Sequence, residues 1–180
     1  MIEQRAENIK QRREGVQVKA YCLLLIACCL LASCTVNPNI QGRGDERLQG
    51  TWVEDSLGYR STLLSYTHHG FTFTCDSVYA QLTTYSKTNI YPDSCYNKGI
   101  WNEYAKGTYG VKNDTLFFQA TYTRSNYKQK LSGCYTIGQY LPVFLIRKQV
   151  GDTLYMDNLQ SHVPVKLVRK QKIVCQPKAL

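Results

Sequence analysis

Cysteine is the residue type with the most scope for chemistry in this sequence. Of the eight cysteines in 180 residues, four lie in the last two thirds of the chain, at Cys75, Cys95, Cys134 and Cys175. None of these four belongs to a Cys-x-x-Cys pair, and no Cys/His cluster has the spacing of a zinc site. Outside the cytoplasm, an even set of four cysteines indicates two disulfides, which can pair in three ways.

A further cysteine, Cys34, follows a segment with the features of an export signal. After a basic zone, residues 20–32 form an apolar run of about 13 residues. Such a run is too short for a membrane span of about 20 residues but typical of a signal peptide. Leu31-Ala32-Ser33-Cys34 then matches the bacterial lipobox, an aliphatic residue and two small residues before the cysteine. We therefore expect cleavage after residue 33 and a diacylglyceryl group on the Cys34 thiol; an ordinary signal peptide is the alternative.

Catalytic and metal-binding side chains do not converge in the sequence. His68 and His69 are adjacent, and adjacent residues of a strand point to opposite faces, so they cannot chelate one metal ion in a regular strand. We expect this pair to lie beside a turn, at the surface. The aspartates fall mostly in turns or in the spacer, and neither a Gly-x-Ser-x-Gly elbow nor a glycine-rich phosphate loop occurs. We predict no catalytic residues, no metal and no cofactor.

The net charge of the chain does not specify a partner. Residues 1–33 hold five basic and three acidic side chains, so their removal lowers the net charge from +9 to +7. A basic surface favours anionic partners such as lipid headgroups. No residue pattern indicates nucleic acid, and export argues against it. A solvated surface that happens to be basic is the alternative.

Tyrosine is the most suggestive feature of the composition, with 14 residues. Several of them fall in or beside two long segments without strand patterning, 88–103 and 125–140. These are Tyr85, Tyr91, Tyr96, Tyr104, Tyr127, Tyr135 and Tyr140. Tyrosine joins an apolar ring to a hydroxyl and is favoured at binding surfaces, but it is also a common strand residue. The two segments are therefore the candidate contact surface, and ordinary sheet packing is the alternative.

From Leu48 onward, short stretches rich in Thr, Tyr, Val and Phe are separated by Gly, Asp, Asn and Ser. This pattern predicts short strands joined by tight turns, and no apolar stripe with helical spacing occurs. We expect strands at 50–54, 61–67, 71–75, 78–87, 104–111, 115–124, 141–149, 153–157 and 164–169. Polar or glycine-containing turns are expected at 69–70, 76–77, 112–114 and 151–152.

The alternation of side chains supports one all-β domain. In residues 115–122, Leu116, Phe118, Ala120 and Tyr122 share one face. Strands joined in chain order form an antiparallel up-and-down sheet, and closure removes its edges, so we predict a β-barrel of eight to nine strands. The expected organisation is a signal peptide (1–33), a flexible spacer (34–47), the barrel (48–172) and a basic tail (173–180).

The first predicted strand resembles the start of a known family. Leu48-Gln-Gly-Thr-Trp52 is similar to the Gly-x-Trp opening of lipocalins, and residues 107–116 and 151–155 resemble hairpins of lipocalin-like domains in small bacterial envelope lipoproteins. The closing stretch 165–170 fits the last strand of that group. The resemblance implies a barrel with Trp52 packed across one end. Two departures are the absence of a helix after the barrel and the two long loops.

Counting strands predicts which cysteines meet. In an up-and-down meander, successive connections alternate between the two ends of the barrel. Cys95 and Cys134 then fall in connections at one end, whereas Cys75 lies beside the turn 76–77 at the other, where the tail with Cys175 also leaves. Because a disulfide needs Cα atoms within about 7 Å, 95–134 and 75–175 are the favoured pairs. Four free thiols are the alternative.

Two functions are compatible with these features. The first is a lipid-anchored barrel that binds a small, partly apolar ligand in its interior. The second is a module with a filled barrel whose tyrosine-rich loops contact a protein or glycan of the cell envelope. Because Thr35, and not an aspartate, follows Cys34, the expected location is the outer membrane. Because no acidic run directly follows Cys34, we expect the protein to face the periplasm.

Overall fold

The computed structural model describes residues 40–55 and 62–179, and these residues form mainly β-strands. Eight of the strands have five or more residues: β1 (Gly50–Glu54), β2 (Ser65–Thr74), β3 (Ser77–Ser86), β4 (Ile100–Lys112), β5 (Thr115–Thr123), β7 (Val143–Val150), β8 (Thr153–Asn158) and β9 (Pro164–Gln171). A two-residue strand β6 (Gln139–Tyr140), one helical turn α2 (Asp93–Tyr96) and a 3₁₀ turn (Asn97–Gly99) complete the elements.

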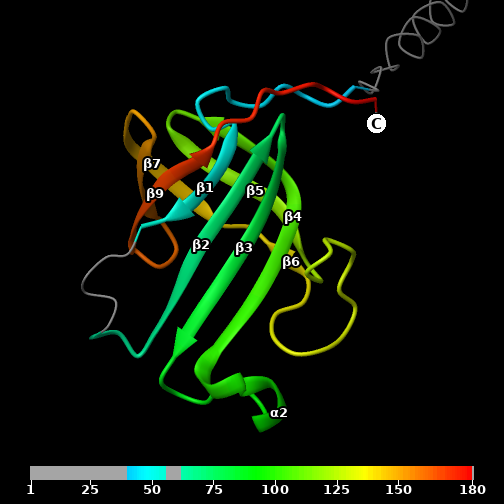
Figure 1. Ribbon diagram of the computed structural model, residues 1–180, viewed down its shortest axis with the longest axis vertical. Helices are drawn as coiled ribbons and strands as arrows, with labels where there is room; N and C mark the ends of the chain where they lie inside the picture. The colour runs from blue at the N-terminus through cyan, green and yellow to red at the C-terminus, as the bar shows by residue number, and fades with distance from the viewer. Residues whose placement is uncertain (1–39, 56–61, 180) are drawn as a thin grey trace, which may run out of the picture. The chain divides into compact units, whose positions relative to one another are not determined.

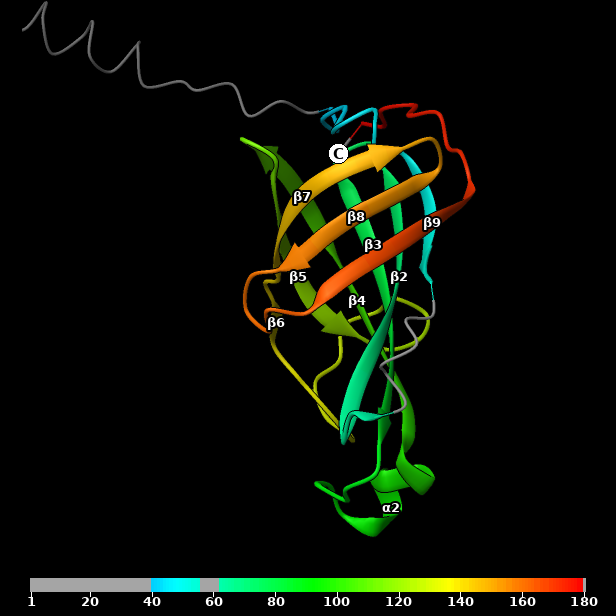
Figure 2. The same cartoon turned by 90° about the vertical axis from the view of Figure 1, so that its left-hand side faces the viewer.

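The eight longer strands close into an antiparallel barrel. The sheet runs β4-β3-β2-β1-β9-β8-β7-β5, and β4 also pairs with β5 from Tyr104↔Thr123 to Lys112↔Thr115, which joins the two edges. Strand β6 adds to β5 through Ala120↔Tyr140. Figures 1 and 2 show the closed wall from two sides. The prediction of an up-and-down barrel of eight to nine strands is therefore confirmed.

Two predicted boundaries are wrong. The expected turn at His69-Gly70 does not exist, because β2 continues through it and pairs with β3 from Ser65↔Ser86 to Thr74↔Ser77. Gly70 lies where β1, β2 and β3 are side by side, and a Cβ there would meet only ordinary contacts, so this glycine serves no turn. In the segment expected as a loop over 88–103, β4 already begins at Ile100.

The two ends of the barrel differ. The turns after β2, β4 and β7 lie at one end, where the described N-terminal segment and the C-terminal tail also run side by side (Figure 1). We call this the closed end. The longer connections, including α2, lie at the other end, which we call the open end. Strands β2, β3 and β4 reach beyond the shorter β7, β8 and β9 there (Figure 2).

Residues 40–49 cover the closed end. Ile40 pairs with Ala179, and the Gln49 side chain, 4% exposed, is hydrogen-bonded to the backbone N–H and C=O of Cys75 at 2.7 and 2.8 Å. The Gln49 amide also donates to the Tyr109 hydroxyl at 2.8 Å. The folded unit therefore begins at Ile40, and not at Leu48 as the sequence indicated.

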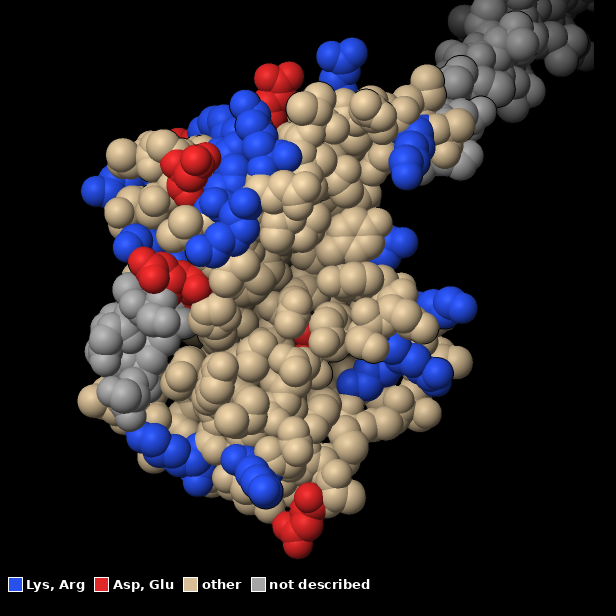
Figure 3. Space-filling model, viewed as in Figure 1, with Lys and Arg blue, Asp and Glu red and all other residues tan. Residues whose placement is uncertain are grey.

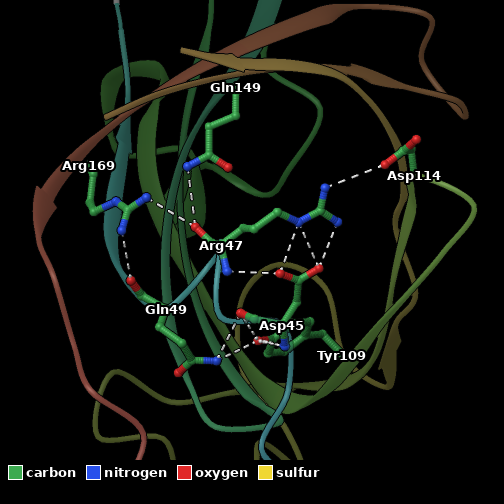
Figure 4. A network of polar contacts seen from close by, with 7 residues as sticks. All are labelled: Asp45, Arg47, Gln49, Tyr109, Asp114, Gln149 and Arg169. Atoms are coloured by element: carbon green, nitrogen blue, oxygen red, sulfur yellow. Dashed lines mark hydrogen bonds and ion pairs between the residues drawn. The ribbon is translucent and has the colours of Figure 1, made fainter. Parts of the chain in front are cut away.

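A network of polar contacts surrounds this cover (Figure 4). Arg47 forms an ion pair with Asp45 at 2.8 Å, and the Arg169 guanidinium donates to the backbone carbonyl of Arg47 at 3.1 Å. Burial alone would raise the pKa of Asp45, but the hydrogen bonds and charge of Arg47 lower it below its usual value. The network ties the chain before β1 to β9.

The core fills the closed half and the middle of the barrel. Trp52 is fully buried, its indole N–H donates to the Leu48 carbonyl at 2.6 Å, and the Arg169 guanidinium lies 4.4 Å from its ring centroid. Phe71 contacts the rings of Phe118 and Phe144 at centroid distances of 5.2 and 5.8 Å. The expectation that Trp52 is buried at one barrel end is confirmed.

Both predicted disulfides are present. Cys75 is bonded to Cys175 at the closed end, with Cα atoms 4.8 Å apart. Cys95 is bonded to Cys134 at the open end, with Cα atoms 5.6 Å apart. The second disulfide joins the two long connections on either side of β4 and β5, and the first fastens the tail to the turn after β2.

Candidate functional site

The open end of the barrel contains a cavity of about 360 Å³. Inward-facing residues of several strands line it, among them Glu54, His69, Leu82, Glu103, Tyr122 and Tyr140. Along the inner face of each strand, these residues come next after the aromatic core residues toward the open end. Glu54, for example, follows Trp52 on β1, and His69 precedes Phe71 on β2. A cavity of this volume falls within the usual range for small-molecule sites.

Glu54 and His69 form a buried polar pair in the cavity wall. The Glu54 carboxylate accepts from the backbone N–H of His69 and lies 2.8 Å from its ring Nδ1. Their side chains are 1% and 14% exposed. The His69 ring packs edge-on against Phe144, with 6.1 Å between ring centroids. The expectation that the histidine pair lies at the surface beside a turn is wrong, because β2 is continuous and directs His69 inward.

Glu103 lies on the opposite side of the cavity, on β4. One of its carboxylate oxygens accepts from the backbone N–H of Thr136 at 2.8 Å, and the other accepts from the indole N–H of Trp101 at 3.3 Å. Thr136 follows Cys134 and Tyr135 in the connection between β5 and β6. The Cys95–Cys134 disulfide therefore fastens the segment that supplies one of the two donors.

Three aromatic rings support this side of the site. Tyr135 stacks on Trp101 with 5.4 Å between centroids, and its hydroxyl donates to the Cys95 carbonyl at 2.6 Å. Tyr91 packs edge-on against both rings at 5.3 Å. Trp101 is 4% exposed. The cluster places the loop residues against the inner face of β4 where that strand extends past the rim.

Tyr122 and Tyr140 form the wall between Glu103 and the aromatic core. Their rings are 5.3 Å apart, and Tyr140 also contacts Phe118 at 6.1 Å. Burial raises the pKa of the Tyr122 hydroxyl, and the Glu103 carboxylate raises it further. Burial likewise raises the pKa of Tyr140, with smaller contributions from Tyr122 and Glu103. Both hydroxyls are therefore protonated donors at neutral pH.

Six of the seven tyrosines expected at a contact surface divide into two groups. Tyr140 lines the cavity, and Tyr91 and Tyr135 pack against each other and against Trp101 beside it. Tyr85 stacks on Tyr66 at 4.9 Å on the outer face, and Tyr127 packs against Tyr104 at 6.0 Å. The remaining one, Tyr96, donates from its hydroxyl to the Ser86 carbonyl at 3.2 Å.

Sequence reasoning missed Glu54, His69 and Glu103 as site residues. A signal for the first two was present, because Glu54 follows Trp52 by two positions and His69 precedes Phe71 by two. A period of two puts such residues on the same face of a strand. The expected turn at His69-Gly70 concealed the second. Glu103 was placed in a loop, so its inward direction was not visible.

Among the described residues, no group of three or more His, Cys, Asp or Glu side chains could hold a metal ion. The same residues include no helix that is both long and apolar enough to span a membrane. Cys34, the expected lipid attachment site, and the expected signal peptide lie outside the described residues.

A second hollow of about 360 Å³ lies on the outer face of the extended strands, beside Tyr66, Tyr85 and Ile100. Ile100 and the neighbouring Leu64 are 47% and 71% exposed. This outer groove is lined by Leu63, Leu64, Tyr66, residues 85–87 and residues 98–100, and apolar side chains gather on it.

Comparison with known proteins found no matching family model, no similar curated sequence and no similar solved structure.

Proposed function

We propose that this chain is a lipid-anchored, lipocalin-like barrel that binds a small, partly apolar molecule in the cavity at its open end. The observation that carries the proposal is the cavity of about 360 Å³ inside an otherwise filled barrel. A barrel of eight strands has room for packed side chains or for one small ligand. Here the aromatic core fills the closed half and stops short of the open end.

The lining of the cavity supports a binding role. Leu82 and the tyrosine rings offer apolar surface, whereas Glu54, His69 and Glu103 direct polar groups into the barrel. Placing such groups inside a barrel costs stability compared with an apolar filling of the same volume. Polar and apolar groups contribute about equally to this wall, and polar groups held in place within a concave site are what orient a bound molecule.

The lipid anchor rests on the Leu31-Ala32-Ser33-Cys34 box and on the apolar run before it. The folded unit begins at Ile40, six residues after Cys34, at the closed end of the barrel. We propose the outer membrane, with the barrel in the periplasm, as its location.

A contact with an envelope protein or glycan is the second candidate. The outer groove favours it, because Leu64, Tyr85 and Ile100 are exposed there together. Most of the other loop tyrosines pack against one another or against the barrel. Because few loop tyrosines are left to contact a partner, we rank ligand binding in the cavity above this second candidate.

The test is native mass spectrometry of the protein purified from its own host, combined with a variant that fills the cavity. Thr84 faces inward, is 8% exposed and lines the cavity. Thr83 is its neighbour on β3 and faces outward, toward Asn102. We expect the wild type and Thr83→Trp to retain a bound small molecule, and Thr84→Trp to lose it.

Melting curves of both variants establish that each is folded, and Ser65→Phe, at another lining position, provides a second blocking variant. A small molecule retained equally by the wild type, Thr84→Trp and Ser65→Phe would contradict binding in the cavity. A wild type that carries no small molecule, but copurifies with an envelope protein through the outer groove, would favour the second candidate.

A further inference from the structure

The charge of the cavity is opposite to that of the molecule around it. On the face shown in Figure 3, Lys and Arg side chains outnumber acidic ones, in agreement with the expected net charge of +7 after removal of residues 1–33. The described lining of the cavity contains Glu54, Glu103 and His69 but neither lysine nor arginine. The remaining polar lining consists of hydroxyl and amide groups.

The two carboxylates are held differently. The Glu54 carboxylate accepts from the backbone N–H of His69 and pairs with the ring Nδ1 of the same residue. The partners of Glu103 are the Thr136 N–H and the Trp101 indole N–H, which are both neutral donors. Among the described residues, Glu103 takes part in no ion pair. Its negative charge is thus oriented but not neutralised by the protein.

One lysine of the connection that carries Thr136 is held by other contacts. Lys130 lies on the same connection as Thr136, and its ammonium group donates to the backbone carbonyls of Cys134 and Thr136. It also sits 5.6 Å from the centroid of the Tyr135 ring. These contacts hold the ammonium group on the loop, while the Glu103 carboxylate faces the cavity beside Tyr122.

The negative charge of Glu103 acts on two tyrosine hydroxyls of the cavity wall. Burial is the main cause of the raised pKa values of Tyr122 and Tyr140, and the Glu103 carboxylate adds to both. A negative charge that disfavours tyrosinate at these two positions favours a cation in the cavity that both residues line.

We propose that the ligand of this cavity is an organic cation, an amine on an aromatic or aliphatic body, and that Glu103 is its counter-ion. The inference rests on the proposed function and specifies the chemical class of ligand. The ammonium group would take the Glu103 carboxylate as a charge-assisted acceptor, and the rings of Tyr122 and Tyr140 would contact the body.

The experiment compares three indole probes that differ in charge but little in shape: tryptamine, tryptophol and indole-3-propionate. Isothermal titration calorimetry at pH 7 and low salt uses the full chain in phosphatidylcholine nanodiscs, with empty nanodiscs as the blank. We expect tryptamine to bind at least about tenfold more tightly than tryptophol, and indole-3-propionate to bind most weakly.

Glu103→Gln removes the charge while it keeps the side-chain shape and an acceptor oxygen. We expect this variant to lower the tryptamine to tryptophol affinity ratio to about one, through loss of tryptamine affinity alone. Glu46→Gln, the same substitution at an exposed position near the closed end, is the matched control and keeps the wild-type ratio. Should Glu103→Gln not fold, the order of the three probes on the wild type still tests the charge.

Equal binding of tryptamine and tryptophol by the wild type, or an unchanged ratio in Glu103→Gln, overturns the inference and leaves a neutral ligand in the same cavity. Failure of all three probes to bind also overturns it. Whether the cavity holds any ligand is decided separately by the molecule that the wild type retains and Thr84→Trp loses.

Discussion

At the level of single residues, Trp52 is the largest fully buried side chain among the described residues. Its indole N–H donates a hydrogen bond to the Leu48 carbonyl, and the Arg169 guanidinium lies over its ring. We expect Trp52→Ala to lower the free energy of unfolding by about 3–5 kcal/mol, as for other buried large aromatic side chains. Phe117→Ala, at a 36% exposed aromatic position on β5, should cost less than about 1 kcal/mol. Urea denaturation measures both, and an unchanged midpoint for Trp52→Ala would show that this ring does not support the core.

Tyr109 gives the closed end a dependence on alkaline pH. Its hydroxyl is bonded to Gln49 and Asp45, and burial raises its pKa from 10.0 to about 12. A raised pKa in the folded state means that the stabilisation is complete below pH 10 and is lost as the pH rises to about 12. In Tyr109→Phe, the free energy of unfolding should therefore fall less steeply across this interval than in the wild type. Thermal unfolding at several pH values measures the slope, and identical slopes would contradict the assignment.

At the level of elements, the two disulfides fasten different parts of the barrel. The bonded cysteines are 100 residues apart for Cys75–Cys175 and 39 residues apart for Cys95–Cys134. In the chain-entropy description, the longer closed loop loses more freedom in the unfolded state. We expect replacement of either pair by serine to cost about 2–5 kcal/mol, and the 75–175 pair to cost more. Chemical denaturation of the two double-serine variants measures this order, and peptide mapping without reduction checks the pairing.

Loss of the open-end disulfide should also have a local consequence. The Cys95–Cys134 bond holds the segment in which Tyr135 stacks on Trp101 and Thr136 donates to Glu103. Hydrogen exchange at residues 125–138 should rise in the variant without this bond and remain unchanged in the variant without Cys75–Cys175. Equal exchange in the two variants would show that the aromatic contacts alone position the segment.

At the level of the whole molecule, attachment to the membrane is predicted to depend on one residue. Cys34→Ala removes the thiol that receives the lipid, so the variant should remain an uncleaved precursor without lipid. Cys29→Ala changes a cysteine inside the apolar run but leaves the Leu31-Ala32-Ser33-Cys34 box intact, and it serves as the control. Detergent phase separation and mass spectrometry of the product measure both. A Cys34→Ala protein that is trimmed and partitions into detergent like the wild type would disprove the anchor.

The strand-forming pattern in the sequence was sufficient to predict the barrel and the cysteine pairs. Alternation places Leu116, Phe118, Ala120 and Tyr122 on the inner face of β5, as expected. The predicted cysteine pairs are correct although the predicted turn at 69–70 within β2 is wrong. The pairing depends only on how the connections from the turn at 76–77 onward alternate between the two barrel ends. The alternation of side chains along a strand and the alternation of connections between the two barrel ends both follow from the order of residues along the chain. The sequence alone therefore determined them.

The candidate site depends on strand register and strand length, which the order of the strands along the chain does not specify. Glu54, His69 and Glu103 come from three strands, and only the register of β1, β2 and β4 in the closed barrel puts them around one cavity. The cavity itself exists because β2, β3 and β4 extend past the shorter strands opposite them, beyond the level where the aromatic side chains fill the interior. Strand length and register follow from hydrogen bonding and packing between distant segments, and for that reason only the tertiary structure decided them.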